Sequence, residues 1–126
     1  MNAKIIAYTD PKLGGTSVEH LMKVAEGFGI KDNVIRKGLI STGGDDAAAK
    51  VANGKTDISI VPITDIHAKD AKLVGPLPEP IQRSMVYSAA ILISSADPAA
   101  ARAFVAALTA PAMRDRWTKA GWQPAK

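Results

Sequence analysis

The chain contains no cysteine among its 126 residues. That absence excludes disulfide bonds, zinc sites built on thiolates and a cysteine nucleophile, although it fits many cell compartments equally well. Aromatic residues are also scarce, with two each of Trp, Tyr and Phe, whereas 22 residues are alanine. The core is therefore expected to be close-packed and rich in alanine.

Long apolar runs and long runs of like charge are missing as well. No apolar stretch approaches the roughly 20 residues of a membrane span, and "MNAKIIAYTDP" lacks the charged and apolar regions of an export signal. The net charge is +4, but the 16 basic residues are scattered among 12 acidic ones. We therefore expect a soluble chain with a mixed, solvated surface and no nucleic-acid partner.

Three short segments have the composition of buried strands. They lie at residues 4–8 ("KIIAY"), 38–42 ("GLIST") and 56–61 ("TDISIV"), and the last is the clearest because it is rich in β-branched residues. The chain length suits a single domain with a real core.

Helices are expected after the first two strands. The first runs from about Ser17 to the glycines at 27 and 29, opened by a capping box of Thr16 and Glu19. The second is capped by Asp45 or Asp46 and ends at Asn53 and Gly54. This alternation predicts an α/β fold, a single three-layer lobe with a largely parallel sheet.

The second half of the chain predicts less regular structure. A short helix is expected at 63–70, then a short strand at 71–74 and a connector containing Pro76, Pro78 and Pro80. An apolar strand is expected at 84–95. Two helices follow, one beginning at Asp97 and Pro98 and the other restarting at 109–111 and ending at Gly121.

Two glycine-rich turns lead into the predicted helices, "LGGTSVE" and "STGGDD". The first amides of a helix lack carbonyl partners and lie at the positive end of its dipole, so such turns can bind anions. Thr16 and Ser17 would add hydroxyl donors, whereas Asp45 and Asp46 would repel an anion. The alternative is a plain capped turn. Because both turns would follow neighbouring parallel strands, where open α/β sheets hold ligands, we favour a binding site.

Two histidines are the other candidates for chemistry. His20 lies one turn into the first helix, where it could act as a general acid or base beside Thr16 and Ser17, or have no role. His67 lies in a polar segment and is expected to be solvated. Neither histidine has acidic neighbours at ligand spacing, so we expect no metal site and no cofactor.

Several catalytic motifs are absent. The chain has no G-x-S-x-G nucleophile elbow, no phosphate-binding G-x-x-x-x-G-K-[ST] loop and no G-x-G-x-x-G turn. Trp117 and Trp122 are expected to pack against apolar neighbours rather than to bind an aromatic ligand.

Four segments resemble one family in their order and spacing: "IAYTDPKLGGTSVEH", "VANGKTDISIVPITDI", "LVGPLPEPIQ" and "DPAAARAFVAALTAPAMRDRWTKAGWQPA". The family is the molybdate-binding-protein-like branch of the type II periplasmic solute-binding proteins, and the resemblance covers almost the whole chain. It implies two α/β lobes that close over a small, usually anionic ligand held by helix N-termini and hydroxyls. This chain resembles the second lobe plus the C-terminal return, without the N-terminal lobe.

The resemblance also implies a set of ligand-binding residues. Gly15, Thr16 and Ser17 match the first anion-binding turn of the family, Gly44 and Asp45 match the next helix start, and Pro62, Ile63 and Thr64 match the pocket segment. Molybdate binders often have a tyrosine in that segment, where this chain has Pro62.

A lone lobe has consequences for partners and location. Residues 1–83 would form the lobe core with its proline-rich connector, and residues 84–126 the crossover strand and C-terminal helices. Without the other lobe, the second part would expose an apolar surface, which predicts a homo-oligomer, with exchange of the C-terminal segment between two copies as one route. A fragment of an exported receptor would be periplasmic and would meet a membrane transporter, whereas a free-standing chain would be cytoplasmic.

The sequence thus predicts binding of a small, anionic solute by one lobe of an ABC-transporter-type substrate-binding protein. One alternative is an enzyme of isomerase or hydrolase type on the same scaffold, using His20 with Thr16 and Ser17. The other is the effector-sensing domain of a transcription regulator, which shares the fold, although this chain has no DNA-binding segment.

Overall fold

The computed structural model describes residues 3–66 and 71–123. The chain divides into two compact units, residues 1–83 and 84–126, and we describe each by itself.

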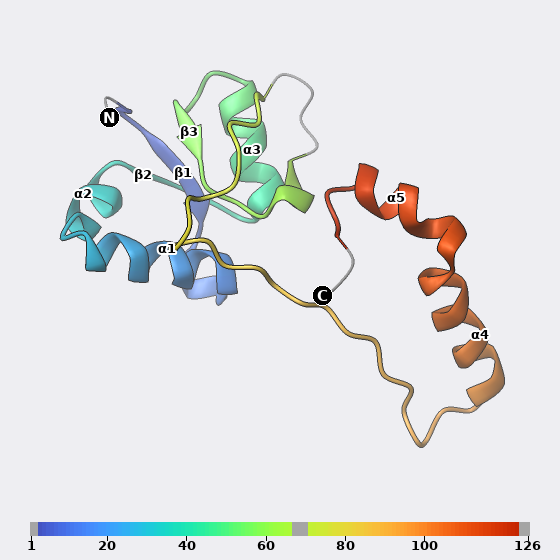
Figure 1. The fold of residues 1–126 in the computed structure, drawn as a ribbon. Helices are drawn as coiled ribbons and strands as arrows, with labels where there is room; N and C mark the ends of the chain where they lie inside the picture. The colour runs from blue at the N-terminus through green and yellow to red at the C-terminus, as the bar shows by residue number, and fades with distance from the viewer. Residues whose placement is uncertain (1–2, 67–70, 124–126) are drawn as a thin grey trace. The chain divides into compact units, whose positions relative to one another are not determined.

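The first unit is built on a three-stranded parallel sheet of β1 (Ile6–Thr9), β2 (Gly38–Ser41) and β3 (Ile58–Ser59), in the order β2-β1-β3 (Figure 1). β1 pairs with β2 along its whole length, from Ile6 opposite Gly38 to Thr9 opposite Ser41. The α/β class and the parallel sheet are confirmed. The predicted third strand shrinks to two residues, because after Ser59 the chain runs to Pro62, which has no amide hydrogen for a ladder.

A carboxylate joins the beginnings of β1 and β3. Asp57 Oδ2 accepts hydrogen bonds from the backbone N–H groups of Lys4 at 2.6 Å and Ile5 at 2.9 Å. These bonds, that of Ile5 above all, hold the pKa of Asp57 below its ordinary value because they favour the charged carboxylate.

Three helices accompany the sheet: α1 (Thr16–Gly27), α2 (Lys31–Arg36) and α3 (Gly44–Ala52). The predicted capping box is wrong, because extended Gly15 is the N-cap of α1 and Thr16 is already its first helical residue. Likewise Gly43, and neither Asp45 nor Asp46, is the N-cap of α3.

The C-terminal end of α3 agrees with the sequence prediction, whereas α2 was not predicted. α3 ends at Asn53, and Gly54 follows with a φ of +68°, as the sequence predicts. α2 lies in a stretch predicted to be a simple connection. It has only six residues, too few to show helical periodicity, and Val34 is its only buried residue.

The helices pack against the sheet in two groups of buried residues, one with α1 and α2 and the other with α3. Tyr8 of β1 packs in a cluster with four buried residues of α1 and α2: Val18, Leu21, Ala25 and Val34. α3 contacts all three strands, and Ala47 and Ala48 of α3 are buried together with Ala7 of β1. The alternation of neighbours along β1 is that of a strand with a layer on each face. The alanine-rich core that the sequence predicts is found in the α3 layer.

The ring of Tyr8 in β1 lies against Gly38 in β2. A Cβ atom added to Gly38 would lie 2.8 Å from Cε1 and Cζ of the Tyr8 ring, closer than carbon atoms approach. Burial, with a smaller effect of the Asp10 charge, raises the pKa of the Tyr8 hydroxyl. Gly38 is therefore required by the aromatic side chain beside it.

The second unit contains α4 (Pro98–Thr109), a 3₁₀ turn η3 (Pro111–Met113) and α5 (Arg114–Lys119). Asp97 caps α4 as predicted, since its carboxylate accepts a hydrogen bond of 2.8 Å from the Ala100 N–H. The predicted second helix is confirmed over a shorter span.

The predicted strand at 84–95 is wrong. Within the described residues this segment belongs to no sheet, and it contains a turn where Ser95 N–H donates to the Leu92 carbonyl. A strand needs a neighbouring strand to form a ladder, and no strand in the described part of the chain pairs with this segment. The short strand predicted at 71–74 is absent for the same reason.

The two tryptophans pack within the second unit. Trp122 meets Tyr87 edge-on at a ring-centroid distance of 4.8 Å, and Trp117 at 6.1 Å. Trp117 Nε1 donates to the Leu108 carbonyl at 2.8 Å. The expected packing role of both tryptophans is confirmed.

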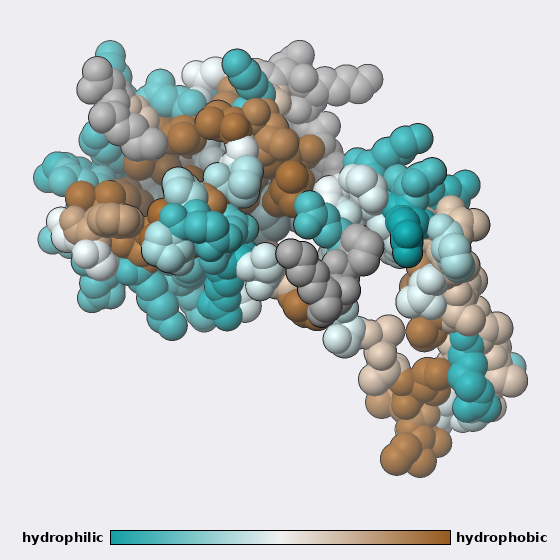
Figure 2. All heavy atoms as spheres, viewed as in Figure 1, coloured by the Kyte–Doolittle hydropathy of each residue, from teal (hydrophilic) through white to brown (hydrophobic). Residues whose placement is uncertain are grey.

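The second unit exposes much apolar surface. Val86, Leu92, Ile93 and Phe104 are each at least 65% exposed, and Figure 2 shows apolar atoms gathered on the chain before α4. None of the helices in the described part is long and apolar enough to cross a membrane.

Replacing Gly38 by Ala should destabilise the fold by about 2 kcal/mol, because the added methyl group overlaps the Tyr8 ring. Urea unfolding followed by far-UV circular dichroism measures this. Gly27→Ala is the control, because a Cβ at Gly27 has no atom within 4 Å, and it should change stability by less than about 0.5 kcal/mol. Equal effects of the two substitutions would contradict the close contact.

Candidate functional site

The carboxyl ends of the three strands bring the predicted ligand-binding turns to one edge of the sheet. Thr9 and Ser41 end β1 and β2 opposite each other, and Asp10 N–H donates to the Ser41 carbonyl at 2.9 Å. The chain after β3 reaches a 3₁₀ turn, η2 (Ile63–Asp65), which contacts α3. All six predicted ligand residues follow these strand ends: Gly15, Thr16, Ser17, Gly44, Asp45 and Thr64.

The turn before α1 leads into the first amides of the helix. Asp10 accepts a hydrogen bond of 2.9 Å from Lys12 N–H and begins a short 3₁₀ turn, η1 (Pro11–Leu13), after which Gly14 has a φ of +64°. The first ladder bond of α1 joins Glu19 N–H to the Gly15 carbonyl at 3.0 Å. The amides of residues 16–18 therefore precede the ladder, at the positive end of a 12-residue helix.

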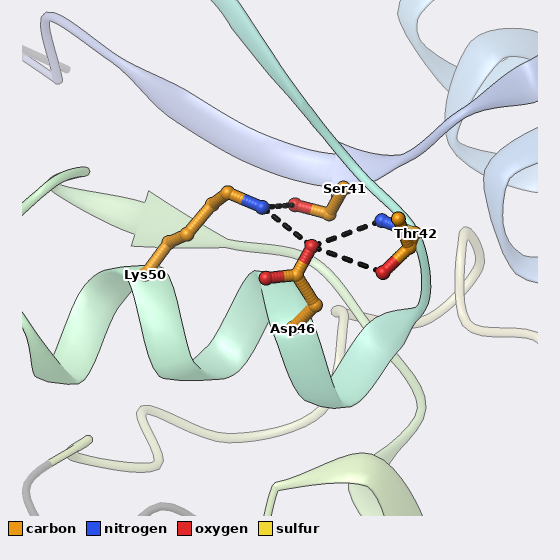
Figure 3. Close-up of polar contacts among 4 residues, drawn as sticks. All are labelled: Ser41, Thr42, Asp46 and Lys50. Atoms are coloured by element: carbon orange, nitrogen blue, oxygen red, sulfur yellow. Dashed lines mark hydrogen bonds and ion pairs between the residues drawn. The ribbon is translucent and has the colours of Figure 1, made fainter.

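The turn before α3 is organised by a carboxylate of its own. Asp46 Oδ2 accepts from the N–H of Thr42 at 3.0 Å, from its Oγ1 at 3.2 Å and from Lys50 Nζ at 2.5 Å (Figure 3). The hydrogen bond from Lys50, followed by that from the Thr42 backbone, lowers the pKa of Asp46. The hydroxyl and amide of Thr42 are thus used within the turn.

Lys50 also donates to Ser41 Oγ at 3.1 Å (Figure 3). A serine beside a lysine can resemble a nucleophile with its base. Here Ser41 is only 2% exposed, and Lys50 forms an ion pair with Asp46. The pair therefore serves the structure of the turn and not nucleophilic chemistry.

Asp65 adds a second carboxylate at the start of α3. A Cβ on Gly44 would lie 2.9 Å from Cβ and Cγ of Asp65, so the Asp65 side chain fills the space that Gly44 leaves. Thr64 Oγ1 donates to Asp65 Oδ1 at 3.1 Å. Thr64, predicted to face a ligand, thus has an acceptor within the chain.

Asp46, Lys50 and Asp65 are residues that sequence reasoning missed as organisers of the site. The spacing of four between Asp46 and Lys50 is a local signal of an ion pair on a helix. Asp65 has no such signal, because its contact with Gly44 spans 21 positions of the chain.

His20 forms a hydrogen bond with the proline-rich connector. Its Nε2 lies 2.7 Å from the Ile81 carbonyl oxygen, and because a carbonyl only accepts, Nε2 is the donor. One ring nitrogen is therefore used to join α1 to the segment after the prolines. His67 lies outside the described residues.

The acidic and histidine side chains of the described residues do not indicate a metal site. In residues 3–66 and 71–123, no three His, Asp or Glu side chains come together as ligands for a metal ion.

The comparisons identify the family. A family model described as bacterial extracellular solute-binding protein matches residues 2–123, nearly the whole chain. The chain belongs to this family of solute-binding proteins, as the resemblance in the sequence indicates at family level. No curated protein and no solved structure matches it.

The hydrogen bonds to Asp46 and Asp57 make the fold less stable as the pH falls. The folded-state pKa values of Asp46 and Asp57 lie below the ordinary 3.8, so the unfolded chain takes up protons at higher pH. Their stabilisation is complete above that value and is lost as the pH falls through the folded-state pKa values.

Asp46→Asn should therefore lower stability at pH 7 and flatten its loss between pH 5 and pH 2, as measured by urea unfolding at a series of pH values. Asp32→Asn is the control, since Asp32 is an exposed acid in the first turn of α2. A pH profile of Asp46→Asn parallel to that of the unaltered chain would contradict the role of the network.

Proposed function

We propose that this chain binds a small anionic solute at the carboxyl edge of its sheet and acts as a binding protein without catalysis. The observation that carries the proposal is the position of the first turn of α1 at this edge, in a chain whose family binds extracellular solutes. Amides that precede the helix ladder and the helix dipole both attract negative charge.

The two hydroxyl side chains beside those amides support an anionic ligand. Thr16 is exposed and Ser17 is half-buried in the first turn of α1, so each can offer a donor together with the backbone. The nearest acid in that turn is Glu19. The α1 turn is thus less acidic than the α3 turn, which carries Asp45 and Asp46.

The wider setting of the proposal is an ABC-type transport system. We propose that residues 1–83 are one lobe of a type II binding protein of the molybdate-binding-like branch, and that residues 84–126 are its crossover segment and C-terminal helices. The family's extracellular description supports action in the periplasm, with a membrane transporter as the partner that accepts the solute.

Isothermal titration of the full chain with acetate and with sulfate tests the binding site. Binding should be weak, with a Kd of about 1 mM, because a single lobe covers its ligand from one side. Ser17→Ala and Thr16→Val should each weaken it about fivefold, the loss of one hydrogen bond of about 1 kcal/mol. Unchanged affinity in both variants would contradict the proposed site.

The substitution His20→Ala distinguishes a binding protein from an enzyme that uses His20. A binding protein should keep its affinity for the same anions, since the His20 ring is bonded to Ile81. An enzyme that uses His20 would lose most of its turnover instead.

We also propose that the chain self-associates through the second unit. The exposed Leu92, Ile93 and Phe104 offer apolar area to a second copy, and exchange of the C-terminal segment between two copies is one route to such an oligomer.

Light scattering after size exclusion at micromolar concentration should therefore give the mass of a dimer or larger oligomer. Ile93→Asp should shift the chain towards the monomer, because it places a charge on the apolar segment. Ser94→Asp, which adds the same charge at the exposed neighbour, should shift it less. A monomeric unaltered chain would contradict self-association.

A further inference from the structure

The proline-rich connector, residues 71–83, leads from the sheet of the first unit to the second unit. It forms no helix or strand in the described part of the chain, and the first unit ends with Arg83. Val74 of the connector is 88% exposed, whereas Ile81 and Gln82 near its end are half-buried. The end of the connector is therefore covered although no ladder holds it.

Two hydrogen bonds shape the end of the connector from within. Ile81 N–H donates to the Pro78 carbonyl at 2.9 Å, which closes a turn. Gln82 Nε2 donates to the Arg83 carbonyl at 3.2 Å. Because both bonds join residues of the connector to each other, they give it a local shape but do not attach it to the rest of the unit.

The bond from His20 does attach it. His20 Nε2 donates to the Ile81 carbonyl at 2.7 Å, across 61 positions of the chain, in a partly buried place. Figure 1 shows the connector passing α1. Val18 and Leu21 fix this part of α1 in the core, so the donor is held by a rigid element. Partial burial strengthens such a bond because water competes less for the carbonyl.

We infer that His20 is a positioning residue that latches the end of the connector to α1, and so sets the length of the flexible linker to the second unit. With the latch closed, the linker begins after Ile81. With the latch open, it begins at residue 71, since no strand or helix of the described residues holds 71–80. A longer flexible linker lets its two ends move further apart. The inference is independent of the anion site and of any ligand.

Backbone order parameters of the isotope-labelled full chain test the latch. In the unaltered chain the amides of residues 81–83 should be as rigid as regular structure, at about 0.85, and in His20→Ala they should fall below about 0.6. His20→Gln should restore them, because its Nε2 is also a donor at a similar distance from the backbone. His20→Asn is the matched control. It carries the same amide on a side chain one methylene shorter, so it should behave like His20→Ala.

Trypsin gives an independent measurement at the exposed Arg83. Cleavage after Arg83 should be about fivefold faster in His20→Ala and His20→Asn than in the unaltered chain, the factor expected for one lost hydrogen bond. It should be unchanged in His20→Gln. Cleavage after Lys119, an exposed residue of α5, serves as the reference and should be equal in all four chains.

Three outcomes would overturn the inference: mobile amides at residues 81–83 in the unaltered chain, no change in His20→Ala, or equal behaviour of His20→Gln and His20→Asn. The last would mean that the ring only fills space. If His20→Ala fails to give a folded spectrum, the Gln and Asn variants still provide the comparison. The ring nitrogen shifts of the unaltered chain need no substitution: the neutral His20 ring should carry its hydrogen on Nε2, and a hydrogen on Nδ1 instead would contradict the latch.

Discussion

The parallel pairing of β1 with β2 is the constraint on which the rest of the first unit depends. Because Thr9 and Ser41 end opposite each other, the two glycine turns that follow begin at the same edge of the sheet. The pairing is close because Gly38 leaves room for the Tyr8 ring, and that ring anchors the cluster of α1 and α2. A change of register by one residue would turn Tyr8 to the other face and separate the turns.

The two helix starts at one sheet edge differ in their surroundings. The α1 turn is followed by the hydroxyl residues Thr16 and Ser17. At the α3 turn, the amide and hydroxyl of Thr42 both donate to Asp46, and Asp65 lies against Gly44. The geometry common to open α/β sheets brings both turns to one edge, whereas single side chains give each turn its own charge and donors.

The features that the sequence predicts are those with local causes. The strands at β1 and β2, the stop at Asn53 and Gly54, and the Asp97 cap each follow from residues within a few positions of one another. The capping residues of α1 and α3 were predicted one to three positions too late, because Thr16, Asp45 and Asp46 are better known as caps than Gly15 and Gly43. α2 escaped prediction because six residues show no period.

The failures at longer range have a different physical origin. The segment 84–95 has the composition of a strand, yet composition cannot supply the neighbouring strand that a ladder requires, and no strand in the described part of the chain pairs with it. The contact of Asp65 with Gly44 and the bond from His20 to Ile81 join residues far apart in the chain. Of the candidate site, the positions at the sheet edge and the acidic residues of the second turn were predictable, but the contact of Asp65 with Gly44 was not.

Anomalous diffraction from crystals of the full chain soaked in sodium bromide tests the central claim most directly, because bromide is a monoanion whose position is seen without assumptions about a ligand. We expect a bromide ion within hydrogen-bonding distance of the amides of residues 16–18. Bromide bound elsewhere in the crystal with none at this turn would contradict the assignment of the anion site.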